Sequence, residues 1–151
     1  MECVPPMPHE STLPDGHVLS DDRGRLDLVM VHRWLTDLAP WARGRPLALT
    51  RRCWANCLCF GVHAPDGSLA GFGRLLTDYT FRAHLGDLMI LPEHRGRGLG
   101  KALVDFILGH PELITVQNWT LTTDDAHGLY ARHGFETGTD GKWMTLNRRL
   151  A

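Results

Sequence analysis

A basic, glycine-rich segment at residues 95–101 (Arg-Gly-Arg-Gly-Leu-Gly-Lys) carries the clearest chemical signal in this chain. It follows an apolar run at 88–91, which is typical of a strand, and a turn at 92–94. The next residues, 102–108, have the pattern of a helix. The first N–H groups of a helix have no intrahelical partner, and glycine lets a ligand approach the backbone closely. Because the helix dipole also favours negative charge there, the segment predicts a phosphate or pyrophosphate site.

Spacing distinguishes three phosphate-binding motifs. The dinucleotide motif is G-x-G-x-x-G, and counting from Gly96 places Lys101 at its last position. The P-loop motif is G-x-x-x-x-G-K-[ST], but Arg95 stands where its first glycine should be, and the residue after the lysine is neither Ser nor Thr. The pattern that remains is R-x-x-G-x-G, formed by Arg95, Gly98 and Gly100.

A second motif lies downstream at residues 125–135 (Asp-Ala-His-Gly-Leu-Tyr-Ala-Arg-His-Gly-Phe). Ala126 and Tyr130 share one face of a predicted helix because they are one helical turn apart. Gly134 is suited to ending that helix before another strand begins. A tyrosine on such a face is either a core residue or part of a site, and the pattern alone leaves both interpretations open for Tyr130.

Together the two motifs resemble those of the Gcn5-related N-acetyltransferase (GNAT) superfamily. In that family [QR]-x-x-G-x-[GA] cradles the pyrophosphate of acetyl-CoA. The tyrosine of A-x-x-L-Y-x-x-x-G-F lies near the coenzyme A thiol and is often assigned as the general acid. The resemblance implies an acetyl-CoA-dependent N-acetyltransferase that moves an acetyl group to a primary amine by direct attack on the thioester. A non-catalytic acetyl-CoA sensor or interaction module of the same fold is the alternative.

The resemblance also implies roles for particular residues. Tyr130 is the expected general acid, and Thr123 replaces an asparagine that many members carry before this tyrosine. Acetyl-CoA is the expected co-substrate, and no metal is expected. The residues expected to bind acetyl-CoA are Met89 and Ile90 along the pantetheine arm, and Arg95, Gly96, Arg97, Gly98, Leu99, Gly100 and Lys101 around the pyrophosphate.

The general base is less clearly indicated. Many family members use a strand glutamate whose position here is Gly86, with Asp87 beside it. A carboxylate within an apolar strand is costly unless it has partners, so Asp87 is a candidate catalytic residue, with a structural aspartate as the alternative. Burial would raise the pKa of Asp87 and suit it to act as a base, whereas a neighbouring cation would lower that pKa. His84 is a second candidate because its ordinary pKa suits proton transfer near neutral pH.

The order of predicted elements agrees with the same fold over the whole chain. We expect an α/β (α+β) protein with the GNAT fold, a mixed central sheet of about six to seven strands flanked by about four helices. It should form a single domain, 1–151, with an irregular arm at 1–14. Besides the helices after the loop and around Tyr130, the pattern predicts helices at 27–38 and 47–56, and strands at 17–20, 58–63, 69–76, 82–91, 114–121, 135–137 and 143–146.

Composition restricts the partners. A formal net charge of −1 argues against a broad nucleic-acid surface. No segment reads as a membrane span or a signal peptide, so we expect a cytoplasmic protein without membrane or nucleic-acid partners. The expected partner is a small-molecule or peptide amine, and a homodimer is compatible with the chain. The cysteines, Cys3, Cys53, Cys57 and Cys59, fit free thiols better than a metal site.

The sequence does not identify the acceptor. The loop at 40–46 and the turn at 77–81 are expected to build its site. Aromatic side chains in these regions could line it or belong to the core. The arginines Arg43, Arg45, Arg51 and Arg52 could attract an acidic acceptor or could simply be solvated.

Overall fold

The computed structural model describes residues 7–138 and 141–147. Within these residues, six strands form one mixed sheet in the order β1-β2-β3-β4-β5-β6. Neighbouring strands are antiparallel except β5 and β6, which are parallel. The strands are β1 (Glu10–Thr12), β2 (Val18–Ser20), β3 (Leu58–His63), β4 (Leu69–Thr77), β5 (Arg82–Ile90) and β6 (Asn118–Thr120).

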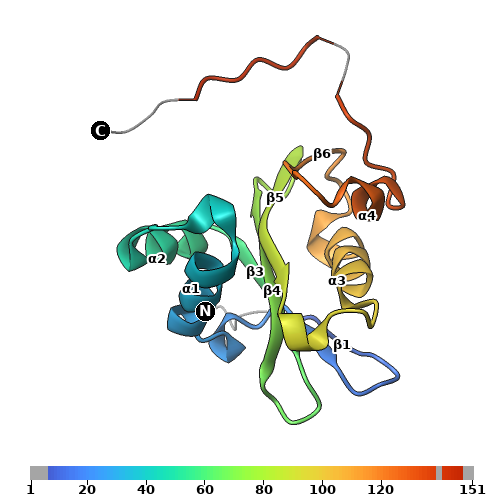
Figure 1. Cartoon of the computed structure of the whole chain (residues 1–151). Coiled ribbons are helices and arrows are strands. Elements are labelled where there is room, and N and C mark those ends of the chain that lie inside the picture. Colours follow the sequence, from blue (N-terminus) through green and yellow to red (C-terminus); the bar gives the residue numbers. More distant parts are fainter. Residues whose placement is uncertain (1–6, 139–140, 148–151) are drawn as a thin grey trace, which may run out of the picture.

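Helices cover both faces of this sheet (Figure 1). On one face lie α1 (Leu28–Leu38) and α2 (Leu47–Ala55), and on the other lie α3 (Leu99–Leu108) and α4 (His127–Ala131). The connections include the short 3-10 turns η1 (Arg23–Arg25), η2 (Pro40–Ala42), η3 (Pro92–His94) and η4 (Pro111–Leu113). No helix in the described part of the chain is long and apolar enough to cross a membrane.

The face covered by α1 and α2 has its own core. The Asp27 carboxylate accepts hydrogen bonds from backbone N–H groups at the start of α1 and so caps that helix. Val31 and Leu35 are both buried, and they lie one turn apart on the same face of α1. They belong to one apolar cluster with Trp54 of α2 and Phe72 of β4.

A second core lies under α3 and α4. Leu103 and Ile107 lie one turn apart on α3 and are fully buried with Phe60 of β3. Tyr130 of α4 belongs to this cluster too, so α4 is fixed against the same face of the sheet. The sheet thus separates two independent apolar layers.

Strand β5 contributes to both layers because it contains a bulge. Phe72 of β4 pairs with Met89 and Arg74 pairs with Gly86, so two residues of β5 lie opposite one residue of β4. One of the two is Asp87, whose backbone is left-handed with a φ of 49°. Aspartate is among the few residues other than glycine that tolerate this conformation.

The bulge moves side chains to the other face of the sheet. Ala83 and Leu85 pack in the core under α3, whereas Met89 packs in the core under α1 and α2. In a regular strand these side chains would all point to one face, because their positions differ by even numbers. The inserted residue reverses the alternation and so directs Asp87 towards α1 and α2.

The outer edge of β5 is mostly unpaired. Strand β6 pairs with β5 only between Arg82 and His84 among the described residues. Beyond the end of β5, the N–H of Leu91 points away from this edge and donates to the carbonyl of Ala70, which follows Leu69 in β4. The alternation of an antiparallel ladder therefore turns the N–H and C=O of Ile90 towards the unpaired edge.

The structure corrects several predicted elements. Glu10–Thr12 forms β1, although the sequence predicted an irregular arm at 1–14. Helix α3 begins at Leu99, so the last loop residues belong to its first turn. The strand predicted at 114–121 is reduced to Asn118–Thr120 because the turn that follows η4 occupies the start of that range.

The two final strands were predicted wrongly. Residues 135–137 and 143–146 are not in strands, although their apolar residues are typical of strands. Trp143, Met144 and Leu146 are exposed, and this segment passes outside the sheet (Figure 1), where the Trp143 ring lies 5.6 Å from the Arg82 guanidinium. A local apolar pattern does not indicate whether the segment can pair with the edge of a neighbouring strand.

Candidate active site

The glycine-rich loop has an open backbone at the start of α3. Gly96 and Gly98 have positive φ values of 78° and 75°. A Cβ added at either position would have no atom within 4 Å. Gly98 is the N-cap of α3, and no side chain caps the helix. The first N–H groups of α3 therefore face a space that an anion can enter.

The loop side chains are held in different ways. Leu99 is buried in the core and anchors the first turn. The Nε of Arg95 donates to the carbonyl of Ile90 at 3.0 Å, which ties the loop to the unpaired edge of β5. The ammonium of Lys101 pairs with Asp105 at 2.8 Å, and Arg97 is exposed. The backbone of the loop is thus fixed, while its cationic groups remain near the surface.

Helix α4 lies beside this loop. A Cβ at Gly100 would be 3.8 Å from atoms of both Ile90 and Leu129. Tyr130 follows Leu129, and its ring packs edge-on against Phe135 with 5.8 Å between ring centres. Burial raises the pKa of the Tyr130 phenol, and the charge of Asp125 raises it further. The hydroxyl is therefore protonated at neutral pH and can donate a proton.

Asp87 is the centre of a buried polar cluster. Its side chain is 1% exposed and accepts hydrogen bonds from Arg45 at 2.8 Å and Arg74 at 2.9 Å. The indole N–H of Trp41, in η2, donates to the same carboxylate at 3.1 Å. Burial alone would raise the pKa of Asp87, but the Arg45 and Arg74 hydrogen bonds outweigh it and lower that pKa from 3.8 to about 2.

This environment argues against Asp87 as a general base. The sequence left open whether burial raises the Asp87 pKa or neighbouring cations lower it, and the two arginines show that the cations lower it. A carboxylate with so low a pKa accepts a proton poorly near neutral pH. Its geometry fits a residue that holds Arg45, Arg74 and Trp41 in place.

Position 86 cannot hold the usual glutamate without rearrangement. A Cβ added at Gly86 would lie 2.9 Å from Nη2 of Arg74, so the guanidinium fills the space in front of this glycine. The sequence did not single out Arg74. The feature that could have indicated it is a single arginine within the otherwise apolar and glycine-rich strand predicted at 69–76.

His84 lies where β5 and β6 separate. It is paired with Thr120 at the last parallel position, and its Nδ1 is 2.8 Å from the Thr120 hydroxyl. Burial lowers the pKa of His84, and the charge of Arg74 lowers it further. The imidazole is therefore neutral at pH 7 and able to accept a proton.

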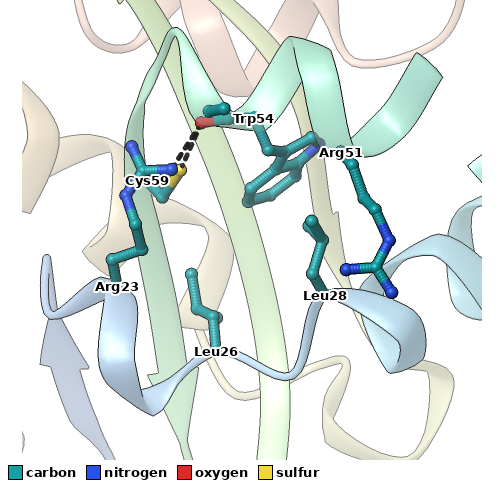
Figure 2. Close-up of a pocket in the computed structure, with 7 residues that line it drawn as sticks. Arg23, Leu26, Leu28, Arg51, Trp54 and Cys59 are labelled. Atoms are coloured by element: carbon teal, nitrogen blue, oxygen red, sulfur yellow. Dashed lines mark hydrogen bonds between the residues drawn. The ribbon is translucent and has the colours of Figure 1, made fainter. Parts of the chain in front are cut away.

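A cavity of about 250 Å³ lies elsewhere, on the side of the sheet covered by α1 and α2. Arg23 and Cys59 both donate to the Trp54 carbonyl at its wall (Figure 2). Its lining consists of Arg23, Leu26, Leu28, Arg51, Trp54, Ala55 and Cys59. No residue predicted as catalytic or cofactor-binding belongs to this set.

The described cysteines, Cys53, Cys57 and Cys59, are free thiols. Cys3 lies outside the described residues. Among residues 7–138 and 141–147, no group of three or more His, Cys, Asp or Glu side chains is placed to hold a metal ion.

Comparisons with known proteins agree with this architecture. The sequence matches the Acetyltransferase (GNAT) family over residues 28–135. The crystal structure of a protein assigned to that family, from Xanthomonas campestris pv. campestris, matches with a TM-score of 0.81 and 41% identity over 96% of both chains. Histone acetyltransferase TAP1 of Glycine max is 28% identical over 87% of this chain and 63% of its own length. Uncharacterized N-acetyltransferase ycf52 of Gracilaria tenuistipitata var. liui is 35% identical over 71% of this chain and 61% of its own.

The chain therefore belongs to the GNAT acetyltransferase family, and the predicted fold is confirmed. Membership implies the use of acetyl-CoA and an amine acceptor. The chain spans less than two thirds of the length of these two curated relatives.

We expect Gly98→Asp to weaken acetyl-CoA binding by well over tenfold, about 1.4 kcal/mol or more, because it adds bulk and negative charge at the open start of α3. Isothermal titration calorimetry measures the affinity. Gly67→Asp is the matched control, since Gly67 also has a positive φ with no atom near its Cβ position but lies in the β3–β4 turn. Equal affinities in the two folded variants would contradict the loop assignment.

We expect Asp87→Asn to lower the free energy of unfolding by at least about 2 kcal/mol at neutral pH, because two partly buried guanidiniums lose their counter-ion. The Asp87 pKa is depressed in the folded state, so its contribution is complete above 3.8 and is lost as the pH falls towards about 2. Urea unfolding at several pH values should show the difference from wild type shrinking over that range. Asp37→Asn, on the exposed side of α1, should change little, and a difference independent of pH would refute this account.

Proposed function

We propose that the protein is an acetyl-CoA-dependent N-acetyltransferase that transfers the acetyl group to a primary amine by direct attack on the thioester. The observation that carries this proposal is the uncapped, glycine-lined start of α3 beside the unpaired edge of β5. These two features offer N–H groups to a pyrophosphate and a strand edge to an extended amide-containing arm.

This arrangement supports roles for the residues proposed to bind the cofactor. The backbone N–H groups of residues 96–101 would surround the pyrophosphate, with Arg95, Arg97 and Lys101 adding positive charge. The outward-facing N–H of Ile90 would hydrogen-bond the pantetheine arm, while its C=O already accepts from Arg95 and Met89 fixes the strand from its buried side. A backbone N–H aimed at the thioester carbonyl would stabilise the developing negative charge, typically by about 3 kcal/mol.

Two side chains would move protons. His84 would take the proton from the attacking amine, directly or through water, as the amine nitrogen bonds to the carbonyl carbon. Tyr130 would donate its proton to the departing thiolate as the carbon–sulfur bond breaks. His84 replaces Asp87 in this proposal because it is neutral at pH 7, whereas Asp87 is held as an anion by two arginines.

The direct experiment measures thiol release from acetyl-CoA with a panel of primary amines, and mass spectrometry identifies the acetylated product. Thiol release that depends on an amine supports the enzyme. Tight acetyl-CoA binding without transfer to any amine would instead favour the non-catalytic sensor.

We expect Tyr130→Phe to lower kcat by on the order of a hundredfold while leaving the Tm and acetyl-CoA affinity nearly unchanged, because only the proton donor is lost. A core role alone predicts normal turnover, since the ring and its contact with Phe135 remain. Turnover at the wild-type rate would remove Tyr130 from the mechanism.

We expect kcat to fall on the acid side with an apparent pKa below 6.5, because burial and Arg74 lower the pKa of His84 and the base must be deprotonated. His84→Gln should depress kcat and remove this acid limb. His127→Gln is the control, because His127 is exposed on α4. An unaltered acid limb in His84→Gln would assign deprotonation to another group.

A further inference from the structure

This inference rests on the proposed function and concerns the acceptor. We infer that the acceptor is a small amino-acid-like molecule, whose carboxylate binds Arg45 and Arg74 while its amine faces the unpaired edge of β5. Such an acceptor differs from a lysine side chain or a protein N-terminus, because these carry no carboxylate next to the amine.

The charges around Asp87 are not balanced within the protein. Arg45 and Arg74 both pair with this one carboxylate, and no other described carboxylate lies within ion-pair distance of either guanidinium. Their side chains are only 20% and 18% exposed. A surplus cation that is largely withdrawn from water is costly without a partner, so the cluster is suited to receive a second anion.

Donor groups remain available for that anion. Arg74 uses its Nε on Asp87 and Nη1 on the Cys57 sulfur, while its Nη2 lies in front of Gly86. Arg45 uses both terminal nitrogens on Asp87, in a forked arrangement that keeps its guanidinium plane fixed, and each of these nitrogens carries a second N–H. Arginine in such a fixed position recognises carboxylates well.

The cluster is also close to the proposed reaction centre. Gly86 is two residues from His84 on the same strand, roughly 7 Å along it. One small molecule can therefore place its carboxylate at Arg74 and its amine nearer His84. Trp41, which is 60% exposed, stands at the rim of the cluster with its indole N–H fixed by Asp87. Its ring offers an apolar surface to the acceptor side chain.

The experiment compares the proteinogenic L-amino acids with their L-amino acid amides as acceptors, measuring thiol release from acetyl-CoA at saturating cofactor. Each pair differs only in the carboxylate, and rates are expressed per concentration of neutral amine. We expect kcat/KM at least tenfold higher for the preferred amino acid than for its amide. Equal or better use of the amide overturns the inference and leaves the proposed function standing.

Arg45→Gln tests the site itself. It should raise the KM for the preferred amino acid at least tenfold and abolish the preference over the amide, with acetyl-CoA affinity unchanged. Arg43→Gln is the matched control, because Arg43 is an exposed arginine in the same loop. Retention of the preference in a folded Arg45→Gln variant counts against the inference. Thiol release with neither set nor with simple amines refutes the proposed function, and the inference fails with it.

Discussion

The candidate active site is organised around the buried carboxylate of Asp87. Its side chain is 1% exposed and holds Arg45 and Trp41, from the segment after α1, together with Arg74 on β4. An ionised carboxylate out of water needs such donors, and each donor is fixed by satisfying it. One interaction therefore joins a long connecting segment to two strands of the sheet.

The same residue determines how β5 divides the molecule. Because Asp87 is inserted at a bulge, the strand turns Leu85 to the core under α3 and Met89 to the core under α1 and α2. The strand is therefore anchored from both faces, as well as by β4 along one edge. With its shape fixed in this way, β5 can leave most of its other edge unpaired beyond His84. That edge runs from His84, where β6 ends, to Ile90, whose carbonyl accepts a hydrogen bond from Arg95 of the loop before α3.

The parts of the site that could be predicted from the sequence are those whose chemistry is local. The glycine-rich loop was recognisable because its glycines, cations and helix start lie within residues 95–101. The partners of Asp87 were not recognisable, because Trp41 and Arg45 are 46 and 42 residues away in sequence. The bulge that directs Asp87 towards them has no local signature beyond an aspartate in an apolar strand. Likewise, the apolar pattern at 143–146 does not reveal that this segment pairs with no strand of the sheet.

Both parts of the candidate site, the 95–101 loop and the Asp87 cluster, contain more cations than anions. The chain has a formal net charge of −1, so the cations of the 95–101 loop and of the Asp87 cluster act locally and not as part of a basic surface. In the proposed function the loop cations would face the phosphates of acetyl-CoA, while Arg45 and Arg74 carry one positive charge more than Asp87 neutralises. An acceptor carboxylate would make this second cluster neutral, so the two arginines would hold the acceptor without stabilising its ammonium form. A lone glutamate at position 86 would instead stabilise the ammonium form. Only a neutral amine can attack a thioester, so a site with Gly86 and Arg74 in place of a glutamate remains compatible with catalysis. It requires a neutral group such as His84 to receive the proton.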